Sequence, residues 1–543
     1  MALNSAIRVP LPEQGLIIRR SGKYQYVYKV FKTYRTDSGQ PTNDRKSIGK
    51  LDPKSGLLIP NNNYYELYDE VMESSFGAID KTATSFSHYE SVRAIGTTFI
   101  IKSILESLNV PSILTTVFGD KKASMILTSA IYMVSRGNIF ERVTDWCEGF
   151  TIFERVVTPV SASRLFSSIT YQERISFFRE WVSFQLQSGY LAYDVTSFST
   201  YAKGIHDAEW GYNRDKESLP QINLGCYFGQ DNGLPLFYMT YSGSITDKSH
   251  LPYMMAYNKE LGISNVCFIL DRGFCTEPNI SYMHKSEKMY LCGVDVSHKE
   301  ILAVIKEVRD GIISMRNVIK QGLYACTMHD QFYGNPTNLH IYFDPNSVEQ
   351  QRQNLYRIIT TTEEKLLKIE KLTEKTMKRF LKYFDVELAK DGSFTYEHNY
   401  EKIDELAKNC GFFCLLTNTD INTEDALSLY RRKDVIEKSF DELKNHIDMK
   451  RMHTHNSDTT DGKIFCSFIS LIAVSQMTSL LSEFMRSKSM SKDALISELE
   501  KIKIITMIDG SRLMNPVTKT QRTIFEACNL SEDDLKAYVN DGL

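Results

Sequence analysis

The chain has 543 residues and a formal net charge of −3, and 42% of its residues are hydrophobic and 24% charged. These values are typical of a soluble globular protein with about three or four domains. They exclude a mainly disordered chain, a collagen-like fibre and a small disulfide scaffold. The near-neutral charge also excludes a uniformly basic nucleic-acid binder.

The N-terminal segment departs from this charge balance, because residues 1–60 contain eleven Lys and Arg but only four Asp and Glu. Residues 23–35 (KYQYVYKVFKTYR) alternate aromatic or aliphatic with basic side chains, which is typical of a β-strand. We therefore predict a basic β-rich module over residues 1–85. Its interleaved aromatic and basic side chains suit DNA contact, and they equally suit a half-buried strand with a solvated face.

Apolar residues spaced three and four apart mark the next segment, residues 86–188, as in ASMILTSAIYMVSR. This spacing predicts a helical domain. Short helices joined by turns permit a helix-turn-helix, but ordinary packed helices give the same pattern.

An α/β core is predicted from residue 189 onward. Its first part, residues 189–295, contains a strand (GYLAYDVTSFS), a hairpin turning at Asn232-Gly233, a helix over 248–261 and a nearly all-apolar strand, SNVCFILD. Strand, hairpin, helix and strand in this order predict a mixed sheet.

A long interruption follows at residues 296–409, and we predict that it is an insertion domain. Its sequence predicts a hairpin (GLYACTMHDQFY, then NLHIYFDP) and a charged helical stretch from about Val348 to Phe384. The core resumes over residues 410–475 with the apolar strand GFFCLLTNT and helices from about 423 to 446. Residues 476–543 predict a helical C-terminal region.

Cysteine usage and the apolar segments indicate where the protein works. The ten Cys residues form no CxxC pair, which favours buried free thiols in a reducing compartment. The N-terminus has no apolar stretch long enough for a signal peptide. Ser and Gln residues interrupt the most apolar stretch, 464–481, so a buried helix fits it better than a membrane span. We expect a cytoplasmic protein.

Two acidic residues stand out by their position on the predicted core strands. Asp194 lies inside the first strand, and Asp271 ends the apolar run of the last one. A carboxylate near buried strands is costly unless it is paired, protonated or bound to a cation. Each Asp alone is compatible with a strand-end or turn-capping role. Together, on strands that can be neighbours, they are candidates for a site.

A third element is the predicted helix YRRKDVIEKSFDELKNH. At about 100° per residue, Tyr430, Lys433, Glu437 and Lys444 fall within about 60° of one another on a continuous helix. A separate apolar stripe lies beside this edge. A solvated face with salt bridges is the alternative interpretation of the edge.

Two Asp and one Glu without His or Cys form a hard-oxygen donor set. Such donors suit Mg²⁺ or Mn²⁺ rather than Zn²⁺. A two-metal carboxylate site activates water or a DNA 3′-hydroxyl for in-line attack on a phosphodiester. Neighbouring Lys and Tyr side chains would hold the DNA backbone.

With these residues the chain resembles the DDE transposases of bacterial insertion sequences, which have an RNase H-like, retroviral-integrase catalytic fold. It is most similar to the group with a Tyr-x2-Arg-x3-Glu-x6-Lys signature. Tyr430, Lys433, Glu437 and Lys444 reproduce that spacing, with Lys433 in place of the usual Arg. Lys keeps the charge but lacks the bidentate fork of Arg.

Further matches support the resemblance, which covers about residues 189–470. They are Asp194 in YDVTSF and the DRGF segment at 271–274. The 166 positions from Asp271 to Glu437 resemble the β-rich insertion that this group places before its Glu. The implied fold is a multidomain α/β protein whose RNase H-like, mixed-sheet core is interrupted by a β-containing insertion domain. A small β-rich N-terminal module and helical N- and C-terminal regions flank this core.

The resemblance also implies roles. Asp194, Asp271 and Glu437 would be catalytic and bind two Mg²⁺ ions, for which Mn²⁺ can substitute. The residues implied to contact DNA are Tyr430, Lys433, Lys444 and Arg272.

The implied partners are double-stranded DNA, as terminal inverted repeats and as target, and a second copy of the chain in a synaptic homodimer. Residues 1–85 would bind DNA, and residues 86–188 would recognise ends or dimerise. The implied activity is metal-dependent cleavage and strand transfer, of cut-and-paste type, in a bacterial cytoplasm. Relatives excise DNA through a hairpin, a step for which no Trp in the insertion marks a stacking platform.

Two alternatives remain at this point. One is a sequence-specific DNA-binding protein derived from a transposase, and the other is a metal-dependent nuclease that never joins strands.

Overall fold

The computed structural model describes residues 8–22, 24–36, 39–68, 89–151, 156–186, 189–213, 215–319, 322–508 and 511–541. The chain divides into two compact units. One comprises Met1–Val92 and Ile505–Leu513, and the other comprises Arg93–Ile504 and Met514–Leu543. These units do not follow the six segments predicted from the sequence, whose boundaries stay predictions. The predicted boundaries at residues 85 and 188 lie outside the described residues.

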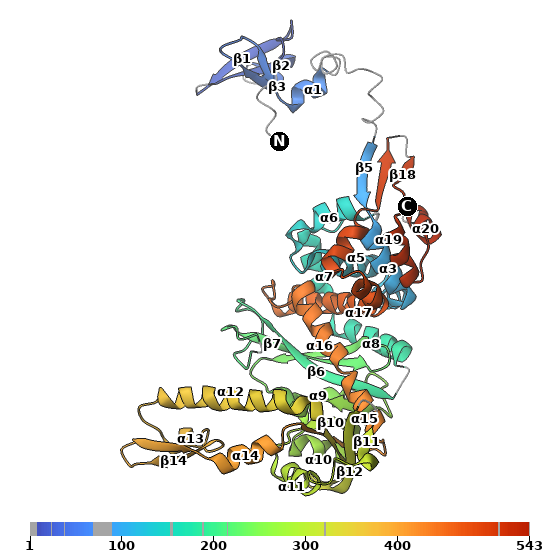
Figure 1. Ribbon diagram of the computed structural model, residues 1–543. Coiled ribbons are helices and arrows are strands. Elements are labelled where there is room, and N and C mark those ends of the chain that lie inside the picture. The colour runs from blue at the N-terminus through green and yellow to red at the C-terminus, as the bar shows by residue number, and fades with distance from the viewer. Residues whose placement is uncertain are drawn as a thin grey trace. The chain divides into compact units, whose positions relative to one another are not determined.

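The N-terminal module is a four-stranded antiparallel sheet in the order β1-β2-β3-β4, drawn in dark blue in Figure 1. Its strands are β1 (Leu16–Ser21), β2 (Tyr24–Arg35), β3 (Pro41–Leu51) and β4 (Leu58–Pro60), and helix α1 (Asn62–Leu67) follows. A small apolar core under one face contains Val9, Val27, Ile48, Leu58 and Tyr64. The predicted β-rich character of this segment is confirmed.

The predicted helical segment forms a group of helices around one long helix, α17 (Ser457–Ser487). Its helices are α3 (Gly96–Ser107), α4 (Val110–Phe118), α5 (Asp120–Arg136), α6 (Val143–Phe150), α7 (Pro159–Ser168) and α8 (Tyr171–Gln185). Thr158 and Thr170 begin α7 and α8 with capping boxes, which satisfy the free N–H groups of each first turn.

Helix α17 contains the apolar stretch 464–481 that was compared with a membrane span. By length and composition it is the one helix among the described residues that could cross a membrane, but 72% of its most apolar window is buried within the protein. The prediction of a buried helix is therefore confirmed. The ten cysteines are all unpaired, and all except the half-buried Cys326 are buried.

The core of the second unit is a nine-stranded mixed sheet in the order β11-β12-β13-β16-β10-β9-β6-β7-β8. Strands β6, β7 and β8 are antiparallel, whereas β9 and β10 run parallel to β6. The strands are β6 (Tyr190–Ser199), β7 (Gln221–Gly229), β8 (Pro235–Ser242), β9 (Cys267–Leu270), β10 (Met289–Val294), β11 (Val318–Ile319), β12 (Leu323–Phe332), β13 (Asn335–Phe343) and β16 (Phe412–Thr417).

This sheet confirms the predicted mixed α/β class and most of the predicted strands. The predicted helix over 248–261 is α9 (Asp247–Ala256), and two helices that the sequence analysis did not predict are α10 (Glu277–Lys285) and α11 (Lys299–Val308). Strand β10 was not predicted either, although it separates β9 from β16.

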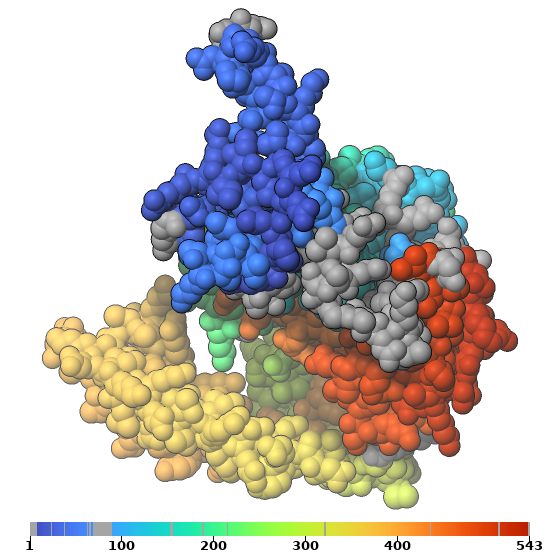
Figure 2. Space-filling model, turned by 90° about the horizontal axis from the view of Figure 1, so that it is seen from above, coloured from blue at the N-terminus to red at the C-terminus, as the bar shows by residue number. Residues whose placement is uncertain are grey.

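The predicted hairpin of the insertion is β12–β13, and it extends the large sheet because β13 pairs with β16. Beyond it lie α12 (Val348–Leu367), α13 (Glu374–Met377), β14 (Phe384–Leu388), β15 (Phe394–His398) and α14 (Tyr400–Lys408). These elements have their own apolar cluster, which includes Leu366, Phe384 and Ile403. They extend from the sheet as an arm, in yellow and orange in Figures 1 and 2.

After β16 the chain is mainly helical, as predicted. Its elements are α15 (Thr423–Arg431), α16 (Asp434–Asp441), α17, α18 (Lys492–Leu499), α19 (Lys519–Ala527) and α20 (Glu532–Asp541). Two short strands, β17 (Lys503–Met507) and β18 (Arg512–Met514), were not predicted. They form a three-stranded sheet with β5 (Tyr89–Ala94), in the order β18-β17-β5.

Candidate active site

The two strand-borne acids are brought together by the register of the large sheet. Strands β6 and β9 are parallel neighbours, and their last register pair joins Tyr193 to Leu270. Asp194 and Asp271 are the next residues on each strand, and the backbone at Asp271 is still extended. Paired residues of neighbouring strands point to the same side of the sheet. The register therefore places both carboxylates side by side, as the sequence analysis expected of neighbouring strands.

Asp194 lies in a buried environment and is only 6% exposed. Its Oδ1 accepts a hydrogen bond from the backbone N–H of Val195 at 2.8 Å. Burial, followed by the negative charge of Asp194, raises the pKa of the Cys226 thiol well above its usual value. This thiol, opposite Asp194 on β7, therefore stays protonated at neutral pH.

Asp271 stands at the end of β9, where the chain enters a one-turn helix (Arg272–Phe274). Its side chain is 45% exposed. Its Oδ1 accepts a hydrogen bond from the Tyr430 hydroxyl at 3.2 Å and lies 3.6 Å from the Lys433 Nζ. Residues from the segment 430–433 therefore hold this carboxylate.

Lys433 links Asp271 to Glu437. Its side chain is only 5% exposed, and its Nζ lies 4.0 Å from the Glu437 Oε1 as well as 3.6 Å from the Asp271 Oδ1. Glu437, on α16, is 68% exposed. A buried ammonium group within ion-pair distance of two carboxylates reduces their mutual repulsion.

Tyr430 fits against the sheet because β10 has a glycine at the point of contact. A Cβ atom at Gly293 would overlap the Tyr430 hydroxyl. Burial raises the pKa of Tyr430, and the charge and hydrogen bond of Asp271 raise it further. The phenol therefore keeps its proton and donates it in the hydrogen bond to Asp271.

The prediction of one continuous helix through Tyr430, Lys433, Glu437 and Lys444 is wrong. Helix α15 ends at Arg431, α16 begins at Asp434, and residues Glu442–His446 form a π-helix. The Lys433 N–H bonds to the Tyr430 carbonyl, three residues back, so the helical ladder tightens there. This turn directs Lys433 inward to Asp271, and the wider π-turn changes the direction of the residues that follow.

Lys444 consequently belongs to a different contact. Its Nζ forms an ion pair with the Asp215 Oδ2 at 2.6 Å, and both side chains are largely buried. Asp215 lies in the connection between β6 and β7. Arg272 follows Asp271 directly and is exposed.

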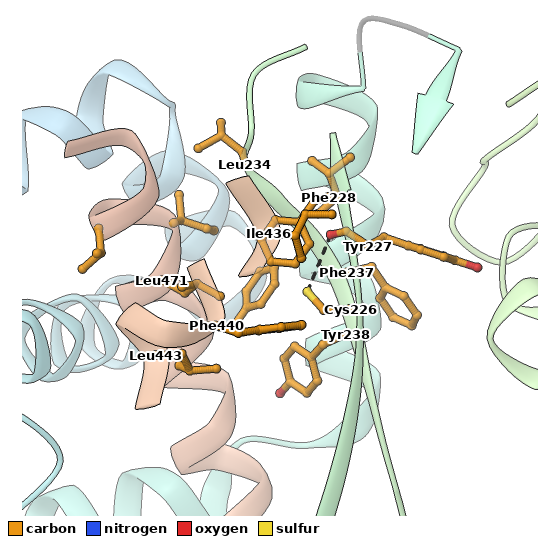
Figure 3. Close-up of a cluster of buried hydrophobic side chains, with 14 of the residues drawn as sticks. Cys226, Tyr227, Phe228, Leu234, Phe237, Tyr238, Ile436, Phe440, Leu443 and Leu471 are labelled. Atoms are coloured by element: carbon orange, nitrogen blue, oxygen red, sulfur yellow. Dashed lines mark hydrogen bonds between the residues drawn. The ribbon is translucent and has the colours of Figure 1, made fainter. Parts of the chain in front are cut away.

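The apolar stripe expected beside these residues is confirmed, and it fixes α16 on the sheet. Ile436, Phe440 and Leu443 are almost fully buried. In Figure 3, Ile436 and Phe440 lie against residues of β7 and β8. The rings of Phe440 and Phe228 meet edge to face with centroids 5.6 Å apart. This packing sets where Glu437, on the same helix, stands relative to the strand ends.

The donor chemistry of the three acids fits a hard divalent cation, because all are carboxylates at one edge of the core. Their positions fit less closely. Within the described ranges no three His, Cys, Asp or Glu side chains form a group that could hold a metal ion. The register places Asp194 beside Asp271, whereas Glu437 is linked to Asp271 through Lys433. The Glu437 side chain is exposed and has to move for all three to share a cation.

Three neighbouring residues were missed by the sequence analysis. Gly293 leaves room for the Tyr430 hydroxyl. A glycine inside the apolar run MYLCGV could have indicated this, because glycine in a strand often marks a close approach of another group. Asp215 forms an ion pair with Lys444, and no sequence pattern around Asp215 predicts this pair. Asp295 follows β10. Burial alone would raise the pKa of Asp295, but hydrogen bonds from Ser297 and the charges of Arg272 and Lys382 hold it below its usual range.

Comparison with known proteins identifies the class of protein. The family model described as transposase DDE domain matches residues 187–472, which is more than half of the 543 residues. The chain therefore belongs to the DDE transposase family, and the resemblance inferred from its motifs is confirmed at this level.

No curated protein matches the sequence. Among solved structures, the chain is similar to a piggyBac transposase synaptic complex with hairpin DNA, with 14% sequence identity and a TM-score of 0.34. The match covers 82% of this chain and 83% of that one.

Proposed function

We propose that the protein is an active DNA transposase that binds the ends of its own insertion sequence, cleaves them and joins them to target DNA. The observation that carries this proposal is the placement of Asp194, inside β6, beside Asp271, which directly follows the neighbouring parallel strand β9, within a matched transposase domain. Lys433 connects Glu437 to the same edge. A non-cutting DNA-binding protein has no need of these three acids.

The proposed catalytic core has the RNase H-like fold. Its support is the strand order β8-β7-β6-β9-β10, with three antiparallel strands followed by two that run parallel to β6. In this proposal the hairpin β12–β13 and the arm beyond it are the insertion that separates Asp271 from Glu437.

In the proposed site, Asp194, Asp271 and Glu437 hold two Mg²⁺ ions, for which Mn²⁺ can substitute. Such ions stabilise charge on the attacking and leaving oxygens of an in-line displacement. Tyr430 orients the Asp271 carboxylate through its hydrogen bond. Lys433 and Arg272 contribute positive charge for a DNA phosphate, and Lys444 does so once it leaves Asp215.

The N-terminal module and the helical segment are proposed to recognise the ends, and two copies of the chain are proposed to act together on paired ends. Cut-and-paste excision in a bacterial cytoplasm belongs to the same proposal. The free, buried cysteines support a reducing compartment.

A cleavage assay tests the proposal. Purified protein is mixed with a labelled duplex that spans one end of its element, with Mg²⁺ or Mn²⁺, and the cut positions are mapped. We expect metal-dependent cleavage at the element boundary. Asp194→Asn, Asp271→Asn and Glu437→Gln should each abolish it and leave duplex binding intact, because each removes a charged oxygen donor without removing a basic residue.

Asp441→Asn provides the matched control, since it makes a like change one turn further along α16 on an exposed side chain. It should cut normally. Binding without cleavage under both metals would favour the DNA-binding alternative, and cleavage without joining in a strand-transfer assay would favour the nuclease. Retained cleavage in any of the three variants would remove that residue from the site.

A further inference from the structure

One face of the N-terminal sheet carries rows of aromatic and basic side chains. Residues directly opposite each other on antiparallel strands point to the same side. Arg19 on β1 is opposite Tyr26 on β2, and Tyr26 is opposite Lys50 on β3. These three side chains therefore form one row across the sheet.

The neighbouring rows continue the pattern. Tyr24 and Tyr28 lie two positions to either side of Tyr26 on β2, and the register places Arg45 on the same side of β3. We call the set of Arg19, Tyr24, Tyr26, Tyr28, Arg45 and Lys50 the outer face. Val27 and Ile48 point to the opposite side, into the small apolar core, so the outer face has no core of its own to cover.

Cations lie over the aromatic rings of the outer face. The Lys50 Nζ is 4.4 Å from the centre of the Tyr24 ring and 5.6 Å from that of Tyr26. The Arg45 guanidinium is 5.3 Å from the centre of the Tyr28 ring. Cation–π contacts of this kind hold long basic side chains in place above the sheet. The charged groups of Lys50 and Arg45 therefore have defined positions above the sheet.

The acidic residues nearby stand elsewhere in the module. Asp44 pairs in register with Lys32, on the side opposite the outer face. Asp52 lies after β3 and accepts a hydrogen bond from Arg8 at 2.8 Å, and this hydrogen bond is the main reason that its pKa falls to about 2. Among the described strand positions that point to the outer side, none is Asp or Glu.

We propose that the outer face binds the sugar–phosphate backbone of duplex DNA. A surface with three cations, two of them held over tyrosine rings, with tyrosine hydroxyls and no carboxylate, is complementary to a row of phosphates. Cations already cover the tyrosine rings, which favours phosphate contact over stacking of unpaired bases. This inference deepens the proposed function and rests on it for the identity of the DNA.

The test measures binding of the full-length protein to two duplexes of equal length, one from an element end and one of unrelated sequence, over a range of salt concentrations. The variant Arg19→Gln/Arg45→Gln/Lys50→Gln removes the three cations of the outer face. Each phosphate contact contributes about 0.9 to the slope of log K against log salt. We expect the variant to lose affinity for both duplexes by a similar factor, and the slope to become shallower by about 2 to 3.

Two control variants accompany it. Arg20→Gln/Lys32→Gln/Lys54→Gln removes the same charge from exposed positions off the outer face, and it should bind nearly as the wild type does. Arg19→Lys/Arg45→Lys/Lys50→Arg keeps the charge, and it should retain most of the affinity, which a merely misfolded module would not.

Three outcomes would overturn the proposal. They are unchanged affinity and slope in the first variant, an equal loss in the off-face control, and a larger loss for single-stranded than for duplex DNA. The cleavage assay separates this inference from the proposed function. An outer-face variant that binds weakly should still cut at low salt and high protein concentration, whereas Glu437→Gln should bind normally and not cut.

Discussion

At the scale of the residue, the carboxylates of Asp271 and Glu437 are organised by one buried cation. Lys433 lies within ion-pair distance of Asp271 and Glu437, and Tyr430 adds a hydrogen bond to Asp271. Carboxylates gathered in a partly buried place repel one another, and this repulsion opposes folding. Lys433 lowers that cost, so Asp271 and Glu437 can be held in the same region of the folded protein without a bound cation.

A second buried lysine provides a pH test of the fold. Lys463, on α17, donates a hydrogen bond to Asn138 at 3.2 Å, and burial lowers its pKa from 10.5 to about 8. The folded protein therefore loses this proton at a lower pH than the unfolded chain does. Below pH 8 the buried charge costs stability, by about 3 kcal/mol at most, and the cost disappears as pH rises from 8 to 10.5.

We expect Lys463→Met to raise the melting temperature at pH 7, by less than the full cost because Asn138 loses its partner. The advantage should vanish near pH 10, where the wild-type lysine is neutral in the folded state. Thermal melts of both proteins at the two pH values check this. An equal difference in melting temperature at both pH values would show that packing, and not the charge of Lys463, causes the difference in stability.

The sequence predicted part of this site and missed the rest for a physical reason. Asp194 and Asp271 stand at recognisable positions on apolar strands, so their adjacency followed from strand order. The partnership of Lys444 with Asp215 did not, because it depends on a π-turn and on a loop 229 residues away. Local patterns carry no information about either.

At the scale of the element, the close contact between α15 and β10 is testable. Gly293 leaves room for the Tyr430 hydroxyl, so Gly293→Ala should push that hydroxyl away from Asp271. Tyr430→Phe removes the same hydrogen bond directly. Because a hydrogen bond to a charged group is worth about 1.5 to 3 kcal/mol, each change should slow cleavage by about ten- to a hundredfold.

The double variant distinguishes this explanation from two independent defects. If both changes act through the Tyr430–Asp271 hydrogen bond, the double variant should cut about as slowly as the slower single variant. Multiplied defects would instead mean that Gly293→Ala disturbs the sheet. Single-turnover cleavage rates at saturating DNA measure the difference.

The packing of α17 against α7 offers a second test at this scale. A Cβ atom at Gly462 would collide with the backbone carbonyl of Phe166, which cannot rotate away. We expect Gly462→Ala to destabilise the protein by about 1 to 3 kcal/mol, as overpacking does. Gly149→Ala, in α6, is the matched control. Nothing lies within 4 Å of its new Cβ atom, so it should be neutral or slightly stabilising.

Thermal melts of Gly462→Ala, Gly149→Ala and the wild type measure both changes in stability. A similar decrease in melting temperature in both variants would mean that the alanine acts through backbone conformation. An unchanged melting temperature in Gly462→Ala would mean that α17 and α7 move apart at little cost.

At the scale of the whole molecule, the arm between β13 and β16 begins and ends at one place. Phe343 and Phe412 are register partners, and the Asp344 N–H donates to the Gly411 carbonyl at 2.9 Å. The arm also has an apolar cluster separate from the main core. We expect that replacing residues 346–409 with a short Gly/Ser linker leaves the large sheet folded, because the two strands then form an ordinary hairpin.

Circular dichroism and a thermal melt check this prediction. The shortened protein should lose the helix signal of α12 and keep a cooperative transition close to that of the wild type. The variant Arg309→Gln is the control, since it removes the 2.8 Å ion pair with Glu405 of the arm and the weaker contacts of Arg309 with Asn409 and Asp310, and leaves the arm in place. Failure of the shortened protein to melt cooperatively would mean that the arm is part of the main fold.

The order of helices and strands was largely predictable from the sequence. The pairing of strands from distant segments was not. Periodicity identified strand β2 and the β-rich character of the N-terminal module, the helical segment, β6 to β9 and the hairpin β12–β13, because each repeats one pattern over several residues. Strand β10, although longer than β9, was not predicted, and neither was the short pair β17–β18. The pairing of β10 with β16 and of β17 with β5 joins distant segments, so no local pattern indicates it.

Strand β5 shows what such a distant partner means for the growing chain. Its neighbour is β17, and the Ile95 N–H bonds to the Ile502 carbonyl at 2.9 Å. A ribosome adding about 5 to 20 residues per second needs roughly 20 to 80 seconds to travel from one strand to the other. Throughout that time the nascent chain carries an unmatched strand edge, and the sheet closes only after β17 has been synthesised. A copy that terminates before β17 therefore lacks the strand that pairs with β5.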